Sequence, residues 1–132
     1  MKSILFKISS IIFLLLFVST ALAEDVYIHH QNYGNTHSKW KNRLEAAGHT
    51  VTSSTNATTN FSGIEQYYDL RYSSSSLPTD GLKTILSNGG TVFLNGENTY
   101  FQSRNNLIQS FIRDVTSDNS ITYSTSLNID YT

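Results

Sequence analysis

The segment Gly89-Gly90-Thr91-Val92-Phe93-Leu94-Asn95-Gly96-Glu97-Asn98 carries the clearest structural signal in this chain of 132 residues. Residues 92–94 form an uninterrupted apolar run, as expected for a parallel strand that is covered on both faces. The glycine pair before them is typical of a helix end, because glycine adopts the left-handed cap conformation at little cost. Ligands of open α/β sheets bind beyond the carboxyl ends of the strands. We therefore expect a binding site in the polar residues from Asn95 onward.

Strand and helix patterns alternate on both sides of this segment. Apolar and alternating runs predict strands at residues 25–28, 49–52 and 68–72. Helical spacing predicts a helix at residues 36–47 and another that starts within residues 77–80, with Pro78 in its first turn, and stops at residues 88–90. A capping-box pattern predicts a brief helix from Ser62. The last helix has one apolar stripe, formed by Leu107, Ile108, Phe111, Ile112 and Val115. Such alternation is typical of a doubly wound, mostly parallel sheet with helices on both faces.

The two ends of the chain differ from this pattern. Residues 1–23 combine a basic head, a short apolar run and the sequence Ala21-Leu22-Ala23, which together predict a cleaved signal peptide and a secreted or periplasmic domain over residues 24–132. Residues 121–131 alternate between apolar and polar side chains, which favours an edge strand or hairpin. No helix is predicted after them, so we also expect that this domain is the first part of a longer protein.

Composition narrows the classes of partner. The formal net charge is −1, and no basic patch is evident, which argues against nucleic-acid binding. The chain contains no cysteine, which excludes disulfides, thiolate metal sites and a cysteine nucleophile. We expect no membrane span once the signal peptide is removed, and we expect a small molecule or a cell-envelope component as the partner.

The order of elements resembles the class I glutamine amidotransferase-like superfamily. The resemblance is carried by residues 26–30, residues 44–51, Tyr68-Asp69-Leu70 and the strand 91–94. Residues 96–112, with Gly96-Glu97-Asn98, Phe101 and Arg104-Asn105-Asn106, are similar to secreted bacterial proteins of unknown function that carry a GEN…F…RN…I pattern. This resemblance implies a three-layer, flavodoxin-like fold. True amidotransferases place a cysteine on the turn after the corresponding strand, so the resemblance does not extend to amidotransferase activity.

Glu97 is the sharpest catalytic candidate, because a carboxylate on a tight turn after a buried strand can act as a general base. The structural alternative is that Glu97 accepts backbone amides or pairs with Arg104, which would clamp the loop. His29 and His30 end the first strand, so one of them is expected to face the same crevice. Together with His37 and Glu97 they can be combined into an open zinc site. We nevertheless predict no metal and no cofactor, since adjacent strand residues point to opposite faces.

Amide side chains gather after the strand 91–94. Asparagine amides can bind sugar hydroxyls or a carboxylate, although asparagine often serves turns and caps instead. The predicted ligand-binding set is Asn95, Gly96, Glu97, Asn98, Arg104 and Asn105. The favoured function is a non-catalytic, secreted ligand-binding or surface-associated module. The alternatives are a hydrolase that uses Glu97 with His29 or His30, and an inactive, truncated gene product.

Overall fold

The computed structural model describes residues 22–32, 34–96 and 99–123. Four parallel strands form one sheet in the order β2-β1-β3-β4. The strands are β1 (Asp25–His29), β2 (Thr50–Ser54), β3 (Gln66–Asp69) and β4 (Thr91–Leu94). This order is that of the first four strands of a flavodoxin-like sheet. The fold predicted from the sequence is therefore confirmed at the level of a small, flavodoxin-like α/β domain.

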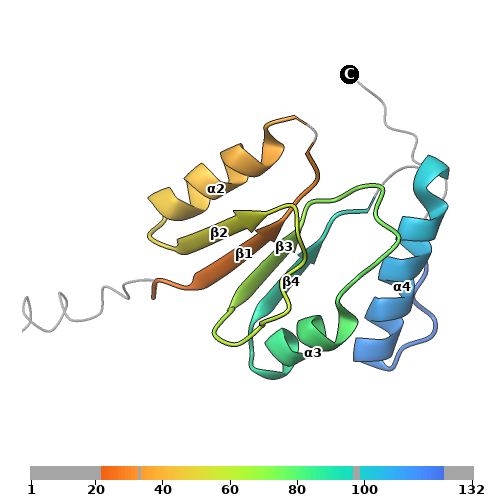
Figure 1. Cartoon of the computed structure of the whole chain (residues 1–132). Coiled ribbons are helices and arrows are strands. Elements are labelled where there is room, and N and C mark those ends of the chain that lie inside the picture. The colour runs from red at the N-terminus through yellow and green to blue at the C-terminus, as the bar shows by residue number, and fades with distance from the viewer. Residues whose placement is uncertain (1–21, 33, 97–98, 124–132) are drawn as a thin grey trace, which may run out of the picture.

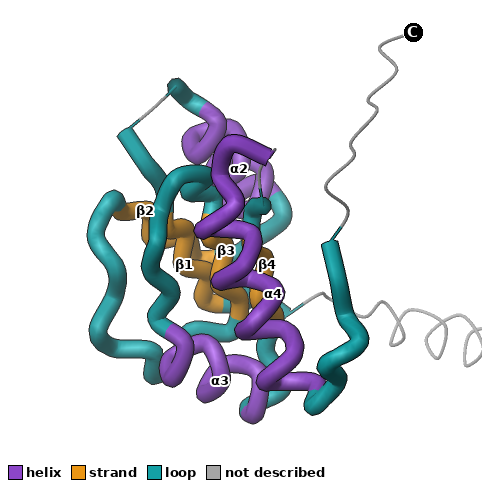
Figure 2. Tube along the Cα trace, turned by 90° about the vertical axis from the view of Figure 1, so that its right-hand side faces the viewer, coloured by secondary structure: helices purple, strands orange, loops and turns teal. Residues whose placement is uncertain are grey.

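Three α-helices cover the two faces of the sheet (Figure 1). Helix α2 (Thr36–Ala46) lies on one face, whereas α3 (Thr79–Ser87) and α4 (Gln102–Thr116) lie on the other. The short 3-10 helix η1 (Thr99–Phe101) leads into α4. Figure 2 shows α4 running across its face of the sheet with α3 beside one end of it. Within the described ranges, no helix is long and apolar enough to cross a membrane.

The main core lies between the sheet and the pair α3 and α4. Its buried members are Tyr27, Tyr67, Leu82, Ile85 and Phe111. The rings of Tyr27 and Tyr67 stack at a centroid distance of 5.6 Å, which joins β1 to β3 within this layer. On the opposite face, Trp40 of α2 packs against Tyr68 and Phe93 at centroid distances of 5.3 and 5.6 Å. The two faces therefore differ, because α2 buries no residue completely.

Strand β3 begins and ends earlier than the predicted range 68–72. The Asp69 carboxylate explains the early end, since its Oδ1 atom accepts a hydrogen bond from the backbone N–H of Arg71 at 3.1 Å. A side chain that bonds the backbone two residues ahead closes a turn and competes with strand pairing. Arg71 is consequently a loop residue rather than the fourth residue of a strand.

The brief helix predicted from Ser62 is wrong, because these residues form a turn. The expected capping partner, Glu65, is used elsewhere: its Oε2 atom accepts from the backbone N–H of Asp25 at 3.0 Å. Gly63 also has a φ of 79°, in the left-handed region that an α-helix does not use. The Glu65 side chain therefore fixes the start of β1 instead of a helix.

The tail prediction is tested only in part. The described residues 121–123 are not in a strand. Instead, the Ile121 carbonyl accepts from Arg113 Nε at 2.8 Å and from Gln109 Nε2 at 3.2 Å, which attaches this segment to α4. Residues 124–132, where most of the predicted edge strand falls, lie outside the described residues.

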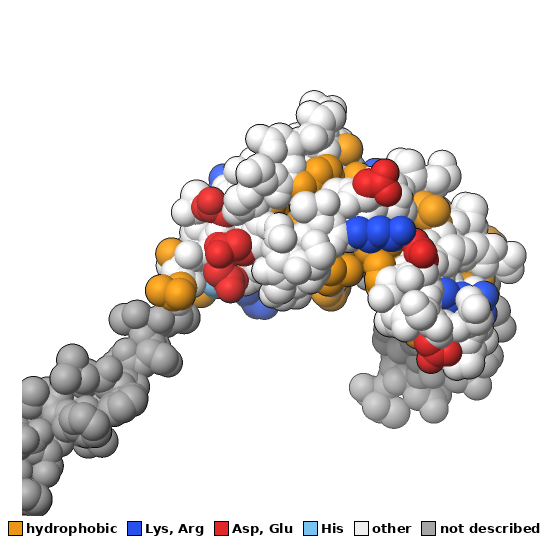
Figure 3. Space-filling view, turned by 90° about the horizontal axis from the view of Figure 1, so that it is seen from below, with side chains coloured by type: hydrophobic (Ala, Val, Ile, Leu, Met, Phe, Trp, Pro, Cys, Tyr) orange, Lys and Arg blue, Asp and Glu red, His pale blue; other side chains and the backbone are white. Residues whose placement is uncertain are grey.

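The space-filling view in Figure 3 shows one face of the domain. Acidic and basic side chains are scattered among uncharged ones, with hydrophobic side chains showing between them. On this face, the described residues form no continuous basic patch of the kind that nucleic-acid binding requires. The absence of a nucleic-acid partner remains a prediction for the chain as a whole.

Candidate functional site

A cleft of about 180 Å³ opens at the carboxyl edge of the sheet. His30 follows β1, Leu70 follows β3 and Asn95 follows β4, so three strand ends converge on it. The chain passes from β1 to β2 on one side and then to β3 on the other, which makes the β1/β3 boundary a topological switch point. Ligand sites of open α/β sheets lie at such points. The described lining residues are His30, Gln31, Thr36, His37, Leu70, Tyr72 and Asn95.

Two imidazole rings form one side of the cleft. The rings of His30 and His37 stack with centroids 3.8 Å apart and planes only 5° from parallel. His30 is 9% exposed, and its Nδ1 atom lies 3.0 Å from the Gln31 carbonyl oxygen, which accepts its proton. This bond leaves Nε2 as the ring atom available to a ligand. Burial and the neighbouring His30 ring both lower the pKa of His37, so protonation of His37 is disfavoured.

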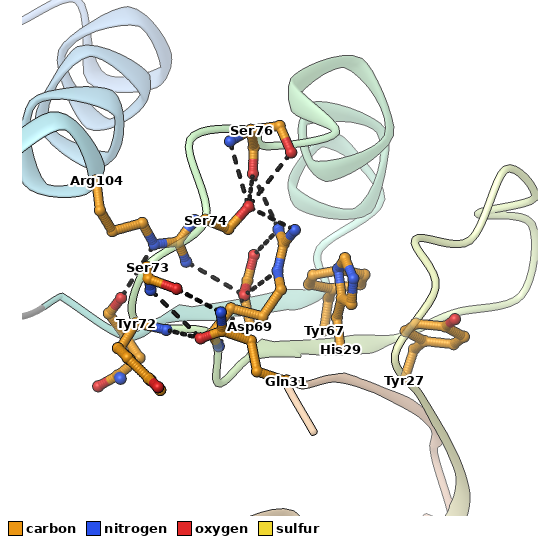
Figure 4. Close-up of polar contacts among 12 residues, drawn as sticks. Tyr27, His29, Gln31, Tyr67, Asp69, Tyr72, Ser73, Ser74, Ser76 and Arg104 are labelled. Atoms are coloured by element: carbon orange, nitrogen blue, oxygen red, sulfur yellow. Dashed lines mark hydrogen bonds and ion pairs between the residues drawn. The ribbon is translucent and has the colours of Figure 1, made fainter. Parts of the chain in front are cut away.

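The side chain of Gln31 organises the loop that follows β3. Its Oε1 atom accepts from the backbone N–H groups of Tyr72 at 2.9 Å and Ser73 at 3.3 Å (Figure 4). The loop after β1 is thereby joined to the loop after β3. Tyr72 also packs edge-on against Phe101 at a centroid distance of 5.4 Å, which holds it in place. The cleft is therefore built from loops that restrain one another.

The first turn of α2 forms another wall of the cleft, through Thr36 and His37. Asn35 occupies the N-cap position, but its side chain makes no capping hydrogen bond, and the first turn of the helix contains no acidic residue. Uncapped amide groups at a helix start carry a partial positive charge. This wall is thus suited to a negative or hydrogen-bond-accepting group.

A buried ionic network lies at the end of β3. Asp69 is fully buried and binds Arg71 in a bidentate manner, with Nε–Oδ1 and Nη2–Oδ2 distances of 2.9 and 2.5 Å. Arg104 reaches the same carboxylate from α4, with Nη2 3.2 Å from Oδ1 (Figure 4). Two guanidinium groups therefore share one carboxylate. Buried charges persist only when they are paired in this way.

Arg104 is the largest completely buried side chain of the described chain. Its Nε atom donates to the Asn95 carbonyl at 3.3 Å, which ties α4 to the loop after β4. The Nη2 atom of Arg104 is close enough to Asp69 for an ion pair, but its N–H groups do not point at the carboxylate well enough for a hydrogen bond. Among the described residues, neither Nη atom of Arg104 has a hydrogen-bond acceptor. Burial lowers the pKa of Arg104, the Asp69 carboxylate opposes this, and the side chain stays charged. Through its Nε hydrogen bond, Arg104 holds the backbone of Asn95 in place.

His29 and His30 point to opposite faces of the sheet. His29 is buried on the α3 and α4 side, where its Nδ1 atom lies 2.9 Å from the Tyr67 hydroxyl. Burial lowers the pKa of His29, and the nearby charge of Arg71 lowers it further, while Asp69 opposes the shift. Burial and the Asp69 carboxylate raise the pKa of Tyr67, so its hydroxyl stays protonated. Of the two strand-end histidines, only His30 can reach a ligand in the cleft.

This environment predicts acid sensitivity. At pH values between 6.5, the ordinary pKa of histidine, and the lowered pKa of His29 in the folded protein, this side chain is protonated in the unfolded chain but not in the folded one. The free energy of unfolding must therefore decrease as the pH falls through this window. We expect His29→Gln to flatten the pH dependence measured by urea unfolding at a series of pH values below neutrality. An unchanged slope in His29→Gln would contradict the assignment of this effect to His29.

The structure places only some of the predicted ligand-binding residues at the cleft. Asn95 lines the cleft, whereas Gly96 is exposed, and a methyl group on it would come within 3.2 Å of Asn105 Oδ1. Asn105 itself is half-buried and has an interaction partner. Glu97 and Asn98 lie outside the described residues, so the predicted general base and the Glu97–Arg104 clamp remain predictions.

Sequence reasoning missed four lining residues: Gln31, Thr36, Leu70 and Tyr72. They could have been found by applying the switch-point rule to the first strand as well as to the strand 91–94. In the described part of the chain, no three histidine or acidic side chains come together to hold a metal ion. Asp69 also went unrecognised, although an Asp-x-Arg sequence directly after a strand favours a local ion pair.

Comparison of the chain with protein families, curated proteins and solved structures finds no significant match.

Proposed function

We propose that this protein is a non-catalytic, extracytoplasmic module that binds a small polar molecule in the cleft at the carboxyl edge of the sheet. The observation that supports this most directly is the convergence of three strand ends on one cleft at the switch point. The cleft presents hydrogen-bonding groups from His30, His37 and Asn95 beside the flat ring of Tyr72. A few polar groups among apolar surfaces are typical of small-molecule sites.

The proposal of a location outside the cytoplasm rests on the signal-peptide pattern of residues 1–23. Descent from the amidotransferase-like superfamily is likewise a proposal, carried by the segments named above. Such a relative would bind without amidotransferase chemistry, because the sequence contains no cysteine to serve as the nucleophile.

Binding is tested by the thermal midpoint of the purified protein in the presence of small sugars and small carboxylic acids. A ligand that binds only the folded state raises this midpoint in a concentration-dependent manner. We expect at least one compound to do so, and we expect Asn95→Ala to remove most of the gain. Asn42→Ala, an exposed position on α2 outside the cleft, is the matched control and should retain the gain.

Two results would oppose the proposal. The first is a midpoint that responds to no compound, and the second is a response that Asn95→Ala and Asn42→Ala retain equally. The hydrolase alternative makes a different prediction, since Glu97→Gln would then abolish turnover of a cleaved substrate without weakening its binding.

A further inference from the structure

We infer that the ligand of this cleft is a small anion, bound through one phosphate or carboxylate group between His30, His37 and the first turn of α2. This inference rests on the proposed binding function and specifies the class of ligand. It starts from the charge of the cleft. Although the chain as a whole has a net charge of −1, none of the described residues that line the cleft is Asp or Glu.

The stacked histidines are the second element of the argument. Two imidazole rings with centroids 3.8 Å apart repel each other when both are protonated, so a doubly charged pair needs a counter-charge. An oxyanion between the rings and the helix start would supply the missing counter-charge and favour protonation. The titratable groups lining the cleft are His30, His37 and Tyr72, whereas Lys39 of α2 and the Asp69–Arg71 pair do not line it.

The third element is the hydrogen-bonding geometry of two independent parts of the chain. His30 is nine-tenths buried, and its Nδ1 atom is used by the Gln31 carbonyl, so Nε2 is left without a partner among the described residues. The start of α2 beside it has amide groups that the Asn35 side chain does not cap. Nε2 becomes a donor when the ring is protonated, and a charged ring donor beside the amide groups of a helix start is an arrangement that binds phosphate and carboxylate groups.

The cleft volume of about 180 Å³ limits the size of the ligand. Sites for drug-sized ligands are larger, at about 300–1,000 Å³. The cleft therefore fits a compact acid or a single phosphorylated fragment better than a nucleotide. Asn95 and Tyr72, on the side of β3 and β4, are placed to contact the rest of such a molecule.

The test measures dissociation constants of the purified protein for sulfate, inorganic phosphate, acetate and a neutral sugar, glucose, at constant ionic strength. Measurements at about pH 5.5 and about pH 8 bracket the ordinary range of histidine titration. Sulfate is the reference anion because its own charge does not change over this range. We expect an oxyanion to bind more tightly at the acidic pH. Tighter binding of phosphate and sulfate would identify a phosphate ligand, and tighter binding of acetate would identify a carboxylate ligand.

Two histidine variants locate the effect. His37→Gln keeps a hydrogen-bonding side chain that does not titrate, and we expect it to lose about tenfold in anion affinity at the acidic pH and to retain the affinity at the alkaline pH. His49→Gln is the matched control, since His49 precedes β2 at the opposite edge of the sheet, and it should behave like the wild type.

The outcomes separate the two proposals. Glucose binding that depends on Asn95, without any oxyanion binding, would overturn the anion inference and leave the binding function standing. Anion binding that His37→Gln and His49→Gln weaken equally, or leave unchanged, would also overturn it, because the anion would then bind elsewhere. Failure of every anion and of the sugars and acids tested above would overturn both.

Discussion

Asp69→Asn is expected to lower the free energy of unfolding by about 3–5 kcal/mol, the usual cost of removing one partner from a buried ion pair. The Asp69 carboxylate is completely buried and is shared by Arg71 and Arg104. An asparagine at this position keeps the shape and one acceptor oxygen but removes the charge. Two buried guanidinium groups would then repel each other with no counter-charge in the described network.

Arg104→Met provides the informative comparison for Asp69→Asn. It deletes one of two cations, so that the bidentate Asp69–Arg71 pair remains charge-balanced, and methionine fills part of the vacated volume. We therefore expect a smaller loss, below about 2 kcal/mol. Urea unfolding gives both values, with the m-value checking that the unfolding reaction has not changed. An equal or larger loss in Arg104→Met would show that Asp69 is not the shared counter-charge of the network.

Phe111→Ala is expected to cost about 3–5 kcal/mol, as is usual when a buried aromatic side chain is truncated to alanine. Phe111 is only 5% exposed and is the residue through which α4 enters the main core, beside Tyr67, Leu82 and Ile85. A small domain has a total stability of about 5–15 kcal/mol, so this single change brings it close to unfolding.

Val115→Ala is the matched control for Phe111→Ala. It lies one helical turn further along the same apolar stripe of α4 but is 38% exposed. We expect a change within about 0.5 kcal/mol, as for a surface substitution. Equal losses in the two variants, measured by urea unfolding, would contradict the docking of α4 through its first three turns.

The stripe of α4 illustrates how far the sequence could predict the core. The spacing of its apolar residues identified the helix and its inward face correctly. It could not identify Arg104, which lies on that face and is more buried than any apolar residue of the helix. A charged side chain is buried only where a distant partner neutralises it, and that partner, Asp69, is 35 positions away in the chain and in a different element.

The candidate site was predicted with similar limits. His30 and Asn95 were recognised because each directly follows a predicted strand, and both line the cleft. His29, recognised by the same rule, faces the other layer of the fold, because successive residues on a strand alternate between faces. The local pattern was compatible with either histidine in the crevice. Only the tertiary structure distinguishes them, since His29 contacts Tyr67 in the main core and His30 stacks on His37 of α2.

Local sequence alone predicted the parallel character of the sheet, the glycine turn that precedes β4 and all its helices and strands except the segment between β2 and β3, where it wrongly placed a helix. It could do so because periodicity and turn chemistry act over a few neighbouring residues. The tertiary structure decided the strand order, and with it the position of the cleft between β1 and β3. It also decided which charges are buried together, as in the Asp69 network. These features depend on contacts between segments far apart in the chain, for which no local pattern carries the information.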